Sequence, residues 1–157
     1  MNEPNRVSRR RALALSGSAL SVAVAGCTGS RADGDSGDAD GQILEREDWE
    51  DIEEIELEGY MSGWVGVAPD LIAGIRNPSL LLFEGNDYEI TWENADNAPH
   101  NIAIRNAENR VVDGNRTSNV RERGQTQTLA FEATETMHEY VCEPHPRSMI
   151  GYLRVDE

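Results

Sequence analysis

Short runs in which apolar and polar residues alternate follow one another along the second half of the chain, and they limit the possible folds more than any other feature. Tyr88, Ile90 and Trp92 alternate with polar residues, and they follow the apolar run 80–83 after a turn at 84–87. We expect these two runs to form neighbouring strands, because alternation is the pattern of a strand with one buried face. Further strand signals cover residues 102–104, 126–131, 139–142 and 151–155. Many short strands with no long helix predict an all-β fold, a Greek-key β-sandwich.

The segments around these strands have weaker patterns. Ile55 and Leu57 alternate with glutamates, which predicts a half-buried strand near a sheet edge. In the stretch rich in glycine and proline that follows, we expect a turn and then one short helix near 69–73, ended by Gly74. Residues 106–124 are polar and rich in turn residues, so we expect them to form a long surface excursion.

Three potential metal ligands lie in one loop near the end of the chain. Residues 140–150 read Y-V-C-E-P-H-P-R-S-M-I, so Cys142, His145 and Met149 bring together a thiolate, an imidazole and a thioether. Soft sulfur with borderline nitrogen suits copper, whereas carboxylates suit magnesium or calcium. A lone buried cysteine or methionine is usually a packing residue. The three types together in one short loop favour a metal site.

A second histidine has to come from outside this loop, and the chain offers His100 and His138. His138 lies four residues before Cys142, which is more than about 12 Å along an extended strand. We therefore expect His138 to be structural or exposed. His100 stands at the start of a predicted strand, where it can face the cysteine loop. Two imidazoles, the thiolate and Met149 as a long axial ligand make the blue-copper arrangement around one copper ion.

These motifs resemble those of a known family. Pro-His-Asn at 99–101, followed far downstream by Cys-x-x-His and then methionine, is similar to the type 1 (blue) copper proteins of the plastocyanin and amicyanin group, and most of all to the haloarchaeal halocyanin-like members. The resemblance covers residues 80–155. Three residues separate His145 from Met149, one fewer than is usual in plastocyanins. The resemblance implies a cupredoxin-like sandwich that carries electrons.

The resemblance also implies roles for residues around the ligands. Family members use the asparagine at the position of Asn101 to tie the loop of the first histidine to the cysteine loop, and such partners brace the metal. The carbonyl of Pro99 is expected to approach the metal. The exposed edge of His145 is where the electron enters and leaves, in a loop stiffened by Pro144 and Pro146. We expect an apolar collar around this edge, formed by Ala98, Pro99, Pro144, Pro146 and Ile150.

The first 26 residues have the features of an export signal. Arg9 and Arg10 precede the modest apolar run 12–25, which matches a twin-arginine (Tat) signal and makes a poor transmembrane helix. Val-Ala-Gly-Cys resembles a lipoprotein cleavage box, so we expect Cys27 to be the lipidated first residue of the mature protein. The alternative is a plain signal peptide with an incidental cysteine. The expected location is the outer face of the cell membrane.

The remaining chain divides into two parts by composition. Residues 27–42 consist mostly of Gly, Ser, Asp and Ala with almost no large apolar side chains, so they predict a flexible acidic linker. Residues 43–157 are long enough for one sandwich with a core, the predicted cupredoxin domain. The linker would hold this domain away from the membrane.

The chain as a whole carries a strongly negative net charge. The formal net charge is −15, and no residue is lysine. Removing residues 1–26 takes away four arginines and one glutamate, which changes the charge from −15 to −18. This composition is typical of proteins from salt-saturated environments and excludes nucleic acid as a partner. In molar salt the screening length falls to about 3 Å, so docking to a redox partner has to rely on short-range apolar contact.

The sequence favours an electron carrier among three function classes. A copper oxidase or nitrite reductase needs a second copper site and more histidines than the three present, so we expect no enzyme. A copper carrier or delivery protein is the alternative, although such proteins usually expose their ligands for release. The expected partners are a redox protein donor and acceptor, in keeping with a membrane electron-transport chain, and the protein is expected to be a monomer.

Overall fold

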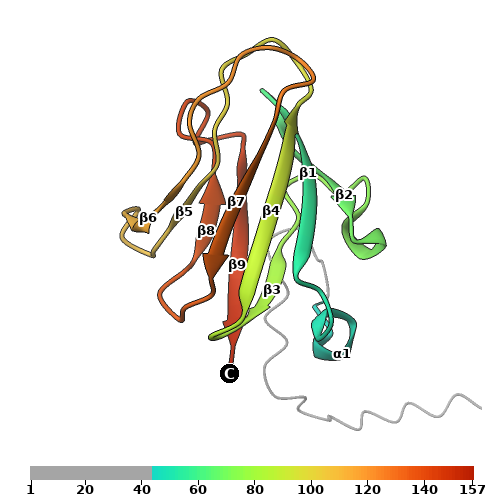
Figure 1. Cartoon of the computed structure of the whole chain (residues 1–157), viewed down its shortest axis with the longest axis vertical. Helices are drawn as coiled ribbons and strands as arrows, with labels where there is room; N and C mark the ends of the chain where they lie inside the picture. Colours follow the sequence, from blue (N-terminus) through green and yellow to red (C-terminus); the bar gives the residue numbers. More distant parts are fainter. Residues whose placement is uncertain (1–43) are drawn as a thin grey trace, which may run out of the picture. The chain divides into compact units, whose positions relative to one another are not determined.

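The computed structural model describes residues 44–157, which form a sandwich of two sheets (Figure 1). The strands of the first sheet are β1 (Glu54–Tyr60), β2 (Gly63–Ala68), β4 (Asp87–Asn94) and β7 (Thr126–Glu132), and those of the second are β3 (Leu80–Phe83), β5 (Ala103–Arg105), β6 (Val111–Arg116), β8 (Glu139–Val141) and β9 (Ile150–Asp156). Their orders are β2-β1-β4-β7 and β3-β9-β8-β5-β6. The predicted all-β, Greek-key sandwich is therefore confirmed. The predicted signal peptide, Cys27 and the linker lie outside the described residues.

Each sheet mixes strand directions. β1 runs parallel to β4 and β3 runs parallel to β9, whereas the other neighbours are antiparallel. In β4 the buried residues Tyr88, Ile90 and Trp92 alternate with polar residues that are exposed or half-buried, as the sequence predicted. The described residues include no helix that is long and apolar enough to span a membrane.

The prediction that residues 80–83 and 87–94 are neighbouring strands is wrong. β3 pairs with β9 in one sheet, while β4 pairs with β1 and β7 in the other. Close to the turn between the two strands, the backbone N–H of Phe83 donates to the hydroxyl of Tyr88 at 2.9 Å. The physical reason is visible in β3, whose four residues are all buried. A continuous apolar run is buried on both faces, unlike the alternating β4.

The surface excursion predicted for residues 106–124 contains a strand that the sequence pattern did not reveal. β6 pairs with β5 at the edge of the second sheet, and Val112 is its only buried residue. Asp113 and Gly114 have positive φ angles of 49° and 75°, which interrupts the regular alternation. An edge strand with so few apolar residues leaves little periodic signal.

The segments before β3 differ in two further respects. The helix expected near 69–73 is present as a short 3₁₀ helix, η1 (Asp70–Ile72). The one α-helix of the described residues, α1 (Arg46–Trp49), precedes β1 and buries Trp49. The glycine-rich stretch forms β2, so β2 is the edge strand and β1 lies one position inside it.

The core between the sheets is aromatic toward the cysteine loop. Trp64 and Trp92 make an edge-to-face contact with ring centroids 5.5 Å apart, and Tyr140 lies 6.4 Å from Trp64. The three side chains are completely buried. Tyr140 is two residues before Cys142, so the strand that bears the cysteine is anchored by this cluster.

Replacing Gly151 by alanine is expected to destabilise the domain. Gly151 pairs with Tyr140 across β8 and β9, and a Cβ at this position would overlap the tyrosine ring. Overpacking of a filled core costs about 1–3 kcal/mol. Urea unfolding of the metal-free protein measures this cost, and a loss below about 0.5 kcal/mol, the size of an ordinary surface substitution, would contradict the close approach seen here.

Candidate metal centre

Two segments far apart in the sequence meet at one end of the sandwich. His100 lies in the loop after β4 and forms an isolated bridge with Val120, each backbone N–H bonding the other's carbonyl at 2.9 Å. Cys142 follows β8 directly, and Figure 1 shows the loops after β4 and β8 toward the same end of the two sheets. The register of β8 between β5 and β9 therefore sets where the cysteine loop begins.

The three strong donor residues are gathered around one point. The sulfur of Cys142 lies 3.6 Å from Nδ1 of His100 and 3.6 Å from Nδ1 of His145. One donor atom from each of the three residues lies within 4.8 Å of the others, and the two imidazole centroids are 4.9 Å apart. His100 and Cys142 are fully buried, while His145 is partly exposed.

These separations fit a metal ion bound by all three atoms. A metal–thiolate bond of about 2.3 Å and a metal–imidazole bond of about 2.0 Å, values known for zinc, place sulfur and nitrogen about 3.5 Å apart at a tetrahedral angle and about 3.7 Å apart at a trigonal one. The observed 3.6 Å lies between the two. A sulfur and two imidazole nitrogens are a donor set that suits copper.

Met149 closes the loop that carries these ligands. Its N–H donates to the carbonyl of His145 at 3.0 Å, and its carbonyl accepts from the N–H of Cys142 at 2.9 Å. The side chain is fully buried, and a Cβ added at Gly59 would lie 3.4 Å from its methyl carbon. The thioether is thus part of the packed interior at this end of the sandwich. Its axial role stays a prediction.

The protonation states of two ligands follow from burial. Burial raises the pKa of the Cys142 thiol, although N–H groups of Asn101 and His145 act in the opposite direction. Burial, together with the nearby His100, lowers the pKa of His145, although Asp96 opposes this. At neutral pH His145 is therefore a neutral imidazole with a free lone pair, whereas the thiol keeps its proton until a metal displaces it.

The match to a family of known proteins decides what this site is for. Residues 84–156 match the model of the copper binding proteins of the plastocyanin/azurin family. This match and the gathered donor set support a type 1 cupredoxin. Its cofactor is one type 1 copper ion, and the gathered donor set fits that ion. The finer likeness to halocyanin-like members stays a prediction.

Solved structures with a similar fold include three cupredoxins. An oxidised amicyanin variant is 20% identical with a TM-score of 0.43, and the match covers 66% of this chain and 82% of that one. Auracyanin from Roseiflexus castenholzii is 17% identical with a TM-score of 0.46, covering 67% and 98%. A purple cupredoxin from Nitrosopumilus maritimus is 24% identical with a TM-score of 0.42, covering 66% and 98%. No curated protein matches the chain.

Asn101 joins the two ligand-bearing segments of this cupredoxin. Its Nδ2 donates to a carboxylate oxygen of Glu143 at 2.7 Å, and its Oδ1 accepts from the N–H of Glu143 at 2.9 Å. The other carboxylate oxygen of Glu143 lies 3.6 Å from Nη1 of Arg116 in β6. The residue after the first histidine thus holds the residue after the cysteine. Pro99 is half-buried directly before His100, and the approach of its carbonyl to the metal stays a prediction.

Asp96 contacts a ligand residue, and the sequence analysis did not assign it to the site. Its Oδ1 lies 2.9 Å from Nε2 of His100, the ring nitrogen on the side away from Cys142. Burial alone would raise the pKa of Asp96, but N–H donors of Ala98 and Met61 and the contact with His100 outweigh it and lower the pKa below its usual value. The sequence signal was an aspartate four residues before the histidine, within a turn.

The apolar collar around His145 stays a prediction, and one exposed apolar residue that it did not include is bonded to the same loops. The predicted collar comprises half-buried Ala98, Pro99 and Ile150 with exposed Pro144 and Pro146. Met61, which the sequence reasoning did not assign, is 57% exposed. Its backbone N–H donates to Asp96 at 2.8 Å and its carbonyl accepts from the hydroxyl of Ser148 at 2.6 Å. The turn between β1 and β2 is thereby bonded to both ligand loops of the cupredoxin.

The remaining histidine lies elsewhere. His138 is exposed, and its ring packs against Tyr152 with centroids 5.9 Å apart. It does not belong to the cluster of His100, Cys142 and His145, in keeping with the expectation that it is not a ligand.

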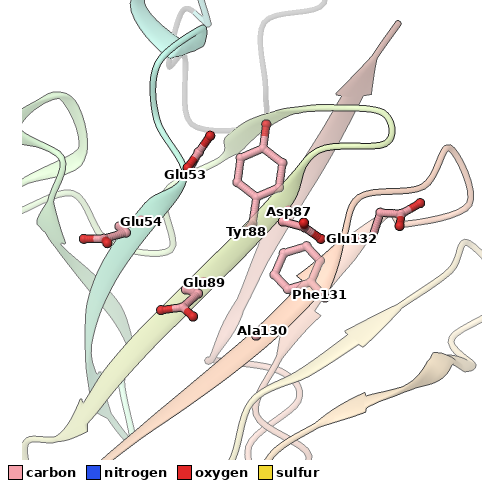
Figure 2. A pocket seen from close by; sticks show the side chains of 8 residues that line it. All are labelled: Glu53, Glu54, Asp87, Tyr88, Glu89, Ala130, Phe131 and Glu132. Atoms are coloured by element: carbon pink, nitrogen blue, oxygen red, sulfur yellow. The ribbon is translucent and has the colours of Figure 1, made fainter.

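An acidic hollow lies at the other ends of β1, β4 and β7. Figure 2 shows its carboxylates around two aromatic rings, and the lining residues are Glu53, Glu54, Asp87, Tyr88, Glu89, Ala130, Phe131 and Glu132. Asp87 is the first residue of β4, whereas the loop of His100 follows its last residue, Asn94. No metal ligand of the cupredoxin lines this hollow, so it is separate from the copper site.

Metal binding is expected to depend on pH through Cys142. Because burial raises the pKa of this thiol, binding has to displace its proton. Lowering the pH by one unit below that pKa should weaken Zn²⁺ binding about tenfold more in the natural protein than in Cys142→Ser. Competition with a chelator measures both affinities. Equal slopes against pH in the two proteins would contradict proton displacement from the thiol.

Proposed function

We propose that this cupredoxin is a membrane-tethered, extracytoplasmic blue-copper protein that carries single electrons. The observation that carries the proposal is the placement of the Cys142 sulfur 3.6 Å from one nitrogen of each of two imidazoles. One of these rings is fully buried and the other reaches the surface. When bound, copper supplies one-electron chemistry by changing between its Cu(I) and Cu(II) states.

The residues of the chain hold this site in one arrangement. His100 is bonded to Asp96, the cysteine loop is closed by hydrogen bonds between Met149 and both Cys142 and His145, and Asn101 spans the two segments. A packed surround that keeps the donor atoms in place reduces the rearrangement that accompanies a change of charge. Burial of Cys142 also keeps water from the thiolate.

Electrons are proposed to enter and leave through the edge of His145. This ring is partly exposed, and the collar around it offers apolar contact with few charges to desolvate. A redox protein donor and a redox protein acceptor of a membrane electron-transport chain are the proposed partners, each meeting one monomer of this chain. In molar salt, where screening acts over about 3 Å, such a contact depends little on the acidic remainder of the surface.

The number of histidines available as metal ligands does not support an enzymatic role. Multicopper catalysis needs a second metal site, and the chain has three histidines in total. Within residues 44–157, one group of clustered histidine, cysteine or carboxylate side chains could hold a metal ion, namely His100, Cys142 and His145.

The tether is proposed from the sequence. The twin-arginine signal at 1–26 and the lipoprotein box before Cys27 predict export and anchoring to the outer face of the membrane, with residues 27–42 as the linker. Replacing Cys27 by alanine is expected to move the mature protein from the membrane fraction to the soluble fraction of the cells that express it. Equal amounts in the membrane fraction for both proteins would exclude the lipid anchor.

The full chain loaded with copper tests the proposed function. An intense thiolate-to-copper absorption band, an EPR signal of one Cu(II) ion and a reversible one-electron wave in voltammetry are expected. Without the band, the blue-copper assignment is wrong. A band without a reversible wave would instead favour the alternative function, an extracytoplasmic carrier that delivers copper.

A further inference from the structure

The two ring nitrogens of His100 have different partners. Nδ1 lies 3.6 Å from the sulfur of Cys142, and Nε2 lies 2.9 Å from Oδ1 of Asp96. A neutral imidazole carries one N–H, which goes to the nitrogen that faces an acceptor. Asp96 accepts only, so the proton belongs on Nε2 and the lone pair of Nδ1 faces the sulfur. His100 is fully buried, so water does not compete for either nitrogen.

The position of Asp96 requires a carboxylate. Three N–H groups converge on it: those of Ala98 at 2.7 Å and His100 at 2.9 Å on Oδ1, and that of Met61 at 2.8 Å on Oδ2. An asparagine has one accepting oxygen, so one of these donors would face its NH₂ group. Both oxygens of Asp96 are thus used, and the negative charge stands one imidazole ring away from the metal position.

The charge of Asp96 is not neutralised by an arginine in the described part of the chain. Its side-chain partner there is the imidazole of His100, which carries no charge in its neutral form. Glu143, the other carboxylate near the site, lies 3.6 Å from Arg116 and bonds Asn101. Between Asp96 and the metal position lies the fully buried ring of His100, and salt screens buried or partly buried groups much less than exposed ones. The effect of Asp96 on the site therefore persists where that of exposed carboxylates vanishes.

We propose that Asp96 is a positioning residue of the copper site that fixes the tautomer of His100 and lowers the reduction potential. The inference rests on the proposed function, because it takes His100 as a copper ligand. Histidine ligands whose second N–H is held by a carboxylate are oriented by it and made more basic. A nearby anion stabilises Cu(II) more than Cu(I), because Cu(II) carries one more positive charge.

The experiment compares Asp96→Asn with a matched control, Glu93→Gln. Both substitutions remove one carboxylate from the same end of the first sheet, but Glu93 is exposed and is not bonded to a ligand residue. The potential of the copper-loaded full chain is measured by voltammetry at pH 7 in low and in molar salt. One electron from the electrode reduces Cu(II) to Cu(I), with no proton or bond exchanged.

Asp96→Asn is expected to shift the redox equilibrium toward Cu(I) by tenfold or more, which is about 59 mV for one electron, at both salt concentrations. Its Cu(II) affinity should fall about 10–100-fold, and its Cu(I) affinity less. The ratio of the two losses has to equal the shift of the redox equilibrium, because the four states form a thermodynamic cycle. Glu93→Gln should give a smaller shift that disappears in molar salt.

A potential that is unchanged, lowered, or shifted no more than in the control would overturn the proposal. The natural chain provides a test that needs no variant. Nitrogen-15 NMR of the metal-free protein at neutral pH should show the His100 proton on Nε2, and a proton on Nδ1 instead would also overturn it. If the copper-loaded natural chain shows no blue absorption band, both the proposed function and this inference are wrong. If the natural chain has the blue band and a reversible wave, but Asp96→Asn does not shift the reduction potential, this inference alone is wrong.

Discussion

Replacing Cys142 by serine is expected to abolish the intense thiolate-to-copper absorption band. The sulfur of Cys142 lies 3.6 Å from each of the two imidazole nitrogens and is fully buried. A serine hydroxyl is a harder ligand that does not ionise at neutral pH, so the two histidines would keep copper without the soft thiolate. The visible spectrum and EPR of the copper-loaded variant check this result.

The matched control is the same substitution at the other cysteine. Cys27→Ser removes a thiol from the predicted lipidation site and leaves the ligands untouched, so its band should equal that of the natural chain. Circular dichroism of the metal-free variants shows whether each still folds. A band that survives in Cys142→Ser, or that is lost in Cys27→Ser, would contradict the assignment of the thiolate.

Replacing Trp64 by alanine is expected to cost about 3–5 kcal/mol of unfolding free energy. Trp64 is completely buried between Trp92 and Tyr140. Its indole N–H has no hydrogen-bond partner in the described residues, so the loss is one of packing and leaves no polar group unpaired. A Cβ at Gly59 would lie 3.0 Å from the Trp64 ring and 3.4 Å from the methyl of Met149. The cavity would therefore open beside the predicted axial ligand.

Urea unfolding of the metal-free proteins measures this effect. Trp64→Phe, which keeps an aromatic ring, should lose clearly less stability than Trp64→Ala. Val67→Ala, on the same strand but 42% exposed, should change stability by less than about 0.5 kcal/mol. A cost for Trp64→Ala as small as that of Val67→Ala would show that Trp64 does not support the core.

The strands that the sequence predicted well are those with regular alternation. β4 carries Tyr88, Ile90 and Trp92 at every second position, and its burial follows that pattern. β6 has one buried residue and was taken for a loop. The predicted neighbour of β3 was also wrong. An apolar run shows that a strand is buried, but it does not show which strand lies beside it.

The sequence by itself determined the chemistry of the site. Cys142, His145 and Met149 stand within one loop, and their side-chain types already favour copper. Only the tertiary structure decided that His100 faces the cysteine, because the register of β8 between β5 and β9 brings the two segments together. Asp96 was missed for the same reason. A carboxylate is one of many in an acidic chain, and its role depends on a direction in space that residue order does not contain.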